Sequence, residues 1–217
     1  MLDSAAAVIA ACDCLHVASP PAHHFAHARA AGAVGTPREL SIALAYAASP
    51  RSWQRDAVSW LDKPQQGGVT REVLSHVLFL TRRQLGAMTL EDARATFAAP
   101  GRSETAIAAR IAAGGVPVTV SGGVGTTLAD DHKAWVLEGP AGAIRLRDWS
   151  YAERHGADGV WSPAPDALPN ERMRPMVLKR QLDGVAAMTR GQAHHLATLR
   201  EALEVQEMVE AILARAA

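Results

Sequence analysis

The sequence predicts a protein of the α+β class: an open, mainly antiparallel sheet of about five or six strands with helices on one face, preceded by a fragment of an α/β unit. Three observations predict this fold. Residues 38–47 alternate between apolar and polar side chains, Gly-rich turns separate short apolar runs between residues 93 and 148, and two helical segments close the chain. Runs of this length and spacing are typical of antiparallel strands.

The elements are predicted in chain order from periodicity and turn residues. Residues 105–113 are rich in Ala, which favours a helix, but their alternation and their Gly-bounded neighbours favour a strand. Residues 49–66 and 150–170 contain Pro, Gly and Trp, and are predicted to be loops. The predicted elements are a helix ending at 11, a strand at 13–19, a helix at 22–31, a strand at 38–47, a helix at 69–85 ended by Gly86, strands at 93–99, 105–113, 116–121, 134–138 and 143–148, and helices at 172–189 and 194–215.

Composition excludes several classes of protein. The chain has 217 residues, and 22 Lys and Arg balance 22 Asp and Glu, so a strongly basic nucleic-acid binder is not expected. Cys12 and Cys14 are the only cysteines, and their C-x-C spacing suits neither a disulfide nor a zinc site. The N-terminus has no basic region before its short apolar run, so we expect no signal peptide and no membrane span, and a cytoplasmic protein.

Three patterns have a structural interpretation that outweighs a functional one. Gly122-Gly123-Val124-Gly125 is part of a dinucleotide fingerprint, but no helix follows it, so a hairpin turn is favoured. His23 and His27 have the spacing of a metal pair without the carboxylate of a zinc protease, and we expect no metal. Asp130–Lys133 is interpreted as a solvated turn at the start of a strand. The loop aromatics either line a sugar-like pocket or pack against the loop stems: Trp53, Trp60, Trp149, Tyr151 and Trp161.

Glu72 and His76 are the candidate catalytic residues. They lie four positions apart on the helix that follows Gly67-Gly68, so they share one helix face. A carboxylate beside an imidazole sets its tautomer and raises its pKa, which suits general acid–base chemistry. The alternative is an ordinary pair on a helix surface.

The order of these patterns resembles the Gfo/Idh/MocA family of NAD(P)-dependent oxidoreductases. The resembling segments are residues 13–31 with Ser19-Pro20-Pro21 and His24 in a T-P-P-x-x-H-like turn, GAVGTPRELSIALAYA at 32–47, the G-G-x-x-x-D-x-x-x-H-like helix at 67–86, the sheet segment at 116–148, and the closing helix at 194–214. Glu72 stands where the family usually has Asp, and His76 matches its histidine.

The resemblance implies two domains and a function. Residues 1–31 would be a remnant of a nucleotide-binding (Rossmann) domain, and residues 32–217 would be the family's C-terminal domain. It implies NAD or NADP as cofactor, bound through Ser19, Pro20, Pro21 and His24, and a sugar-like or cyclic polyol substrate, with Glu72 and His76 as the acid–base pair.

Two departures from the family leave two hypotheses open. The glycine fingerprint and the Glu-Lys-Pro segment of the family are absent from this sequence. The first hypothesis is an oxidoreductase whose chain is truncated, so that its binding of cofactor and its autonomous activity are in question. The second is a non-catalytic protein that uses the same domain to bind a ligand or to assemble.

A homo-oligomer through the open sheet face is also expected. The expectation rests on small and apolar alternating residues of the strands, because an exposed apolar sheet usually pairs with another surface. These residues are Ala106, Ala108, Val118, Val120, Ile144 and Leu146.

Overall fold

The computed structural model describes residues 32–50, 54, 58–128, 132–148, 151–156, 158–165 and 167–216. The predicted Rossmann remnant at residues 1–31 lies outside this part of the chain and remains a prediction.

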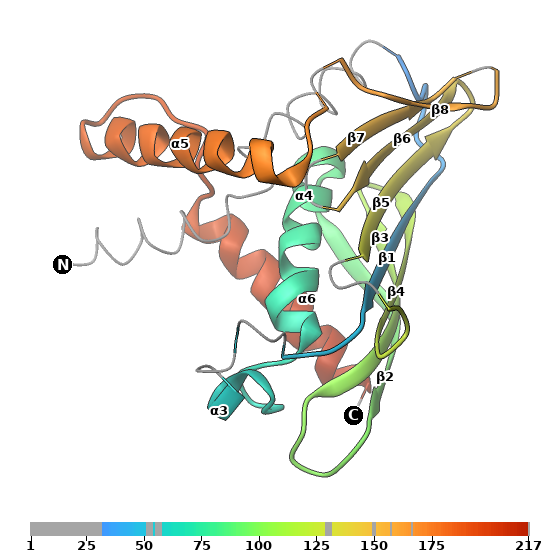
Figure 1. Ribbon diagram of the computed structural model, residues 1–217, viewed down its shortest axis with the longest axis vertical. Helices are drawn as coiled ribbons and strands as arrows, with labels where there is room; N and C mark the ends of the chain where they lie inside the picture. Colours follow the sequence, from blue (N-terminus) through green and yellow to red (C-terminus); the bar gives the residue numbers. More distant parts are fainter. Residues whose placement is uncertain are drawn as a thin grey trace.

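One sheet of eight strands forms the centre of the described structure (Figure 1). Its order is β2-β3-β4-β1-β5-β6-β7-β8, and every neighbouring pair is antiparallel except β1 and β4, which are parallel. The α+β class and the mainly antiparallel sheet are therefore confirmed, with more strands than expected. The strands are β1 (Glu39–Tyr46), β2 (Met88–Phe97), β3 (Glu104–Ala113), β4 (Val116–Val124), β5 (His132–Gly139), β6 (Gly142–Arg147), β7 (Tyr151–His155) and β8 (Trp161–Pro163).

The position of β1 overturns the predicted hairpin at Gly122–Gly125. β1 lies between β4 and β5 and hydrogen-bonds to both, so β4 and β5 do not pair. Gly122 and Gly123 lie within β4, and a Cβ at Gly122 would press on the Ile107 side chain at 2.7 Å. The prediction was wrong because it relied on local turn residues, whereas β1 precedes β4 by about 75 residues in the chain and still pairs with it.

The helices that cover the sheet are α4 and α6 (Figure 1). A π-helical turn, η2 (Thr70–Leu74), leads into α4 (Ser75–Leu85), and α6 (Leu199–Ala216) packs against α4 and β2. The short helix α3 (Val58–Leu61) precedes η2, and α5 (Asn170–Thr189) projects away from the sheet in Figure 1. Helices on one face of the sheet are therefore confirmed for α4 and α6.

The alternation in β1 separates a buried face from an open one. Leu40, Ile42, Leu44 and Tyr46 are buried under the helices, whereas Ser41 and its neighbours on the other side are exposed. Apolar burial on one face of each strand supplies the main stabilisation of such a layer.

This alternation corrects the prediction of an apolar open face. Val118, Val120, Ile144 and Leu146 all point toward the helices and belong to the core. Ala106 and Ala108 alone among the six residues lie on the open side. The neighbours of Ala108 on that side are polar or small, as Thr119, Ser121 and Ala43 show. The open face is therefore small and polar rather than apolar.

Several element boundaries also differ from the prediction, as β2 shows by starting at Met88 rather than at residue 93. The predicted loop at 150–170 contains β7 and β8, which extend the edge of the sheet. These strands carry charged residues and do not alternate between apolar and polar side chains, so periodicity did not reveal them. The predicted helix at 194–215 begins only at Leu199. Thr198 and Glu201 form a capping box: the Glu201 carboxylate accepts the Thr198 N–H at 2.8 Å, and Thr198 Oγ1 accepts the Glu201 N–H at 3.2 Å.

No helix in the described part of the chain is both long and apolar enough to cross a membrane.

The β3–β4 turn offers a sharp test of packing between α4 and the sheet. Gly114 and Gly115 both have positive φ, but a Cβ at Gly114 would overlap the Leu85 carbonyl oxygen, whereas one at Gly115 meets nothing within 4 Å. We expect Gly114→Ala to lower the free energy of unfolding by about 3 kcal/mol or more. The new Cβ would force the backbone at Leu85 to move, and alanine would also be strained at the positive φ of this position. Gly115→Ala, the matched control, should lose only about 1 kcal/mol. Urea denaturation measures both, and equal losses would contradict the close packing.

Glu201 predicts a pH dependence of stability. Burial raises the pKa of its carboxyl, but the Thr198 hydrogen bonds and the charge of Arg83 outweigh burial, so the pKa lies below its ordinary value of 4.5. A lowered folded-state pKa gives stability that is present above pH 4.5 and is lost as the pH falls through the folded value. We expect Glu201→Gln to be about 1 kcal/mol less stable than the parent at pH 7, with the gap closing near pH 3.

The matched control for this measurement is Glu207→Gln, because Glu207 is exposed on the same helix. It should follow the parent at both pH values. A gap for Glu201→Gln that is as wide at pH 3 as at pH 7 would show that the charge of Glu201 is not its source.

Candidate functional site

The candidate site is built on Gly67-Gly68 and the helix that follows. A Cβ at Gly67 would overlap the backbone of Leu61, and the Gly68 N–H donates to the Leu61 carbonyl at 2.9 Å. Gly68 has a φ of +98°, which glycine adopts without strain. The two glycines therefore allow the chain to turn closely around the end of α3 and enter η2.

The first helical residue is held by a carboxylate from the sheet. The Thr70 N–H donates to Glu104 Oε1 at 2.7 Å across 34 residues of sequence, and this bond is buried. The N-terminus of a helix exposes unpaired N–H groups and carries a partial positive charge, so a carboxylate there stabilises the turn.

Glu72 and His76 lie on either side of the junction between η2 and α4. The sequence predicted a regular helix over 69–85, but its first turn is π-helical, with the Ser75 N–H bonded to the Thr70 carbonyl five residues earlier. The Glu72 N–H donates to the Gly68 carbonyl at 3.0 Å. Both side chains are half-buried, and residues four apart remain neighbours on a helix surface. Single π-helical turns occur frequently at functional sites.

Arg71 ties this turn to α6 and to the loop before it. Its guanidinium makes a bidentate pair with Glu210, with both nitrogen–oxygen distances at 2.7 Å, and also donates to the carbonyls of Pro64 and Gly67. The hydrogen bond with Glu210 raises the pKa of Arg71, and the same bond with Arg71 lowers the pKa of Glu210. The backbone around Glu72 is therefore fixed from both sides.

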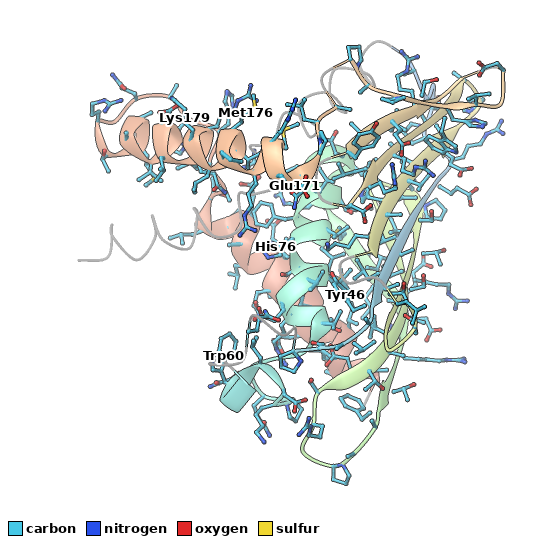
Figure 2. The ribbon with its side chains drawn as sticks, in the orientation of Figure 1. Tyr46, Trp60, His76, Glu171, Met176 and Lys179 are labelled. Carbon is cyan, nitrogen blue, oxygen red and sulfur yellow. The ribbon has the colours of Figure 1, made fainter. Side chains whose placement is uncertain are left out.

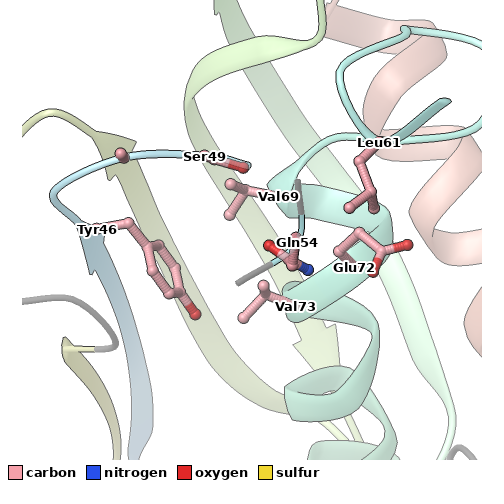
Figure 3. A pocket seen from close by; sticks show the side chains of 8 residues that line it. Tyr46, Ser49, Gln54, Leu61, Val69, Glu72 and Val73 are labelled. Carbon is pink, nitrogen blue, oxygen red and sulfur yellow. The ribbon is translucent and has the colours of Figure 1, made fainter. Parts of the chain in front are cut away.

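A small pocket lies between this turn and the end of β1 (Figure 3). Tyr46, Gln54, Leu61, Glu72 and Val73 are among its lining residues, and it combines apolar walls with an amide, a phenol and a carboxylate. Its volume is about 10 Å³, near the least that holds one water molecule. This pocket can therefore enclose no more than about one water molecule.

Lys133 is a functional candidate that the sequence analysis missed. It was interpreted as part of a solvated turn, but Leu44 is its partner in the β1–β5 register, so it faces the helices and is only 4% exposed. Its ammonium lies 5.6 Å from the centre of the Tyr46 ring, within range of a cation–π contact. The sequence could have revealed this only through the alternation of β5, because Lys133 shares a strand face with the buried residues Trp135 and Leu137.

The other candidates do not join this site. Ser19, Pro20, Pro21 and His24 lie outside the residues that the structure describes, as do Trp53 and Trp149. Tyr151 and Trp161 stack with Arg147 and Arg145 on the open face of the sheet, at 5.0 and 4.2 Å. Trp60 is on α3, and Figure 2 shows it below and to the left of Tyr46. Across the described residues, no group of three or more His, Cys, Asp or Glu side chains could hold a metal ion.

No known family model matches this sequence, and no curated protein matches it. The fold, however, is that of several solved oxidoreductases. Levoglucosan dehydrogenase, solved with NADH and levoglucosan, is 15% identical with a TM-score of 0.73, and the match covers 94% of this chain and 63% of that one. An oxidoreductase from Agrobacterium radiobacter, solved with NAD+, L-tartaric acid and magnesium, is 19% identical with a TM-score of 0.70 over 92% and 60% of the two chains.

A third similar structure binds a larger ligand. The WlbA dehydrogenase from Bordetella pertussis, solved with NADH and UDP-GlcNAcA, is 16% identical with a TM-score of 0.66, over 89% of this chain and 58% of that one. This chain thus spans about 60% of the length of the structures it matches. At these identities the likeness shows a shared fold: the described domain has the architecture found in NAD-binding oxidoreductases.

Proposed function

We propose that this chain carries the substrate-facing domain of a Gfo/Idh/MocA-type oxidoreductase, which transfers hydride between NAD(P) and a hydroxyl-bearing carbon of a sugar-like or cyclic polyol ligand. The observation that supports this most is the placement of Glu72 on the π-helical turn, where it lines a pocket with Tyr46 and Gln54, while His76 follows four residues later in α4. The shared fold with oxidoreductases solved with NAD+ or NADH supports the cofactor class.

In this proposal the described residues handle the proton. NAD(P), when bound, would take up the hydride of the carbon being oxidised. The hydroxyl proton of that carbon would pass to the His76 imidazole, and the Glu72 carboxylate would orient the ring and stabilise its protonated form. The Gln54 amide, which lines the pocket, suits hydrogen bonding to a neighbouring hydroxyl.

The described residues fit the substrate side of such a site rather than the cofactor side. Gly122 and Gly123 lie inside a strand, and a dinucleotide fingerprint needs a turn between a strand and a helix. Contacts with the cofactor remain assigned to Ser19, Pro20, Pro21 and His24, as the resemblance implies, together with residues 1–31 as a Rossmann remnant.

The proposal predicts that His76 is required for turnover but not for cofactor binding. With NAD+ or NADP+ and a panel of cyclic polyols and sugars, we expect His76→Asn to lower kcat by about 10²- to 10⁴-fold and to leave the Kd for NADH unchanged. His155→Asn is the matched control, because His155 lies on β7 beside Trp161 and away from the pocket. Absorbance at the nicotinamide band and NADH fluorescence are the two measurements.

Two results would contradict the proposal. Equal losses of kcat in the two histidine variants would remove the special role of His76. Failure of the purified parent to bind either NADH or NADPH at micromolar concentration would instead favour a non-catalytic protein that binds a ligand or assembles through the same domain.

We also propose that the open sheet face pairs with a second copy of the chain. Supporting this, an exposed surface of small side chains runs across the neighbouring strands β1 and β4, which permits close approach of another sheet: Ser41, Ala43, Thr119 and Ser121. Near its edge lie arginines stacked on aromatic rings, residue types that are enriched in protein interfaces.

Light scattering tests this assembly. We expect the parent to be a dimer or larger at micromolar concentration, and Ala43→Arg to be a monomer, because the new side chain projects from the middle of the flat surface. Glu207→Arg, on the exposed side of α6, should assemble as the parent does. A monomeric parent, or an assembled Ala43→Arg variant, would contradict the use of this face.

A further inference from the structure

Glu104 is a buried charge that the proposed chemistry does not use. It begins β3 and is only 3% exposed. Burial of a carboxylate is costly unless hydrogen bonds or opposite charge compensate it, so its surroundings must account for its presence.

Glu104 lies against the first turn of the helix that carries Glu72 and His76. Oε1 accepts the Thr70 N–H at 2.7 Å. A Cβ on Gly68 would overlap the same carboxylate, so the second glycine of the pair leaves the room in which Glu104 lies. The negative charge of Glu104 is also felt by Arg71, whose pKa is raised chiefly by its hydrogen bond to Glu210 and additionally by Glu104.

The π-helical turn to which Glu104 is hydrogen-bonded is also the turn that contains Glu72. Thr70 is the first residue of η2, and its carbonyl accepts the Ser75 N–H that closes the π-helical turn. Glu72 lies within that turn, and His76 follows directly after it. A helix start without such an anchor is free to fray or to revert to a regular α-helical turn, since its N–H groups have no partners within the helix.

We propose that Glu104 is a positioning residue for Glu72 and His76: its carboxylate fixes the π-helical turn and thereby the backbone from which Glu72 projects, four residues before His76. This inference rests on the proposed function for the role of that pair. Glu104 itself touches neither the substrate-facing pocket nor the pair, and acts through the backbone of Thr70 and the space beside Gly68.

The test compares the pH titration of the His76 imidazole, followed by NMR, in four forms of the full chain. Glu72→Gln removes the partner directly and should lower the titration midpoint of His76. Glu104→Ala should move the midpoint in the same direction by at least half as much. Glu104→Gln keeps a carbonyl oxygen for the Thr70 N–H, so it should restore the midpoint to within a quarter of the Glu72→Gln shift.

A matched variant separates positioning from loss of stability. Ile144→Ala removes a fully buried side chain from β6, which β4, β1 and β5 separate from the Glu104 strand β3 in the sheet. It should destabilise the protein and leave the His76 midpoint unchanged. If Glu104→Ala does not fold, Glu104→Asp shortens the reach to Thr70 and should give a shift between those of the parent and Glu72→Gln.

The outcomes distinguish the inference from the proposed function. A His76 midpoint that responds to Glu72→Gln but not to Glu104→Ala or Glu104→Asp would overturn the inference, as would an equal response to Ile144→Ala. NADH binding is measured on the same samples. Its absence would count against the proposed function while the comparison of His76 midpoints would still decide the role of Glu104.

Discussion

The insertion of β1 between β4 and β5 is the constraint on which the rest of the structure depends. Because β1 hydrogen-bonds on both edges, its buried face forms the middle of the layer under α4 and α6. The same placement sets Tyr46 at the end of β1 beside the helix start, and brings Lys133 to the Tyr46 ring from β5. The positions of the pocket, of the buried Lys133 and of the helix that carries Glu72 and His76 therefore all depend on β1 lying between β4 and β5.

Ion pairs between the helices hold them in place on the sheet. The α4–α6 contact is lined by Arg82 with Glu204 and Arg83 with Glu201, and Arg71 with Glu210 continues it to the helix start. Arg71 also holds the loop before Gly67, and Glu104 holds the backbone after Gly68. A π-helical turn is costlier than a regular one, and these anchors on both sides explain how it persists.

The sequence predicted what local periodicity and turn chemistry can decide. The alternation from Leu40 to Tyr46, the Gly114-Gly115 turn and the helix that ends at Gly86 are all present. The T-x-x-E pattern of a capping box at Thr198 was also present in the sequence. Using it would have placed the start of the last helix at Leu199. The hairpin at Gly122 failed because strand order is non-local, and Lys133 and Glu104 were missed because only their partners from distant segments reveal that they are buried. Glu72 and His76 could be singled out because their spacing is local, and their catalytic role stays a prediction.

The proposed function requires a hydroxyl-rich ligand to bind beside Glu72 and within reach of His76. The most direct measurement follows the imidazole resonances of His76 and His155 by NMR while levoglucosan or myo-inositol is added in the presence of NAD+. We expect the His76 resonances to shift with a saturable dependence on ligand concentration and those of His155 to stay in place. Saturable binding of either ligand that leaves His76 unmoved, or that moves His155 equally, would contradict it.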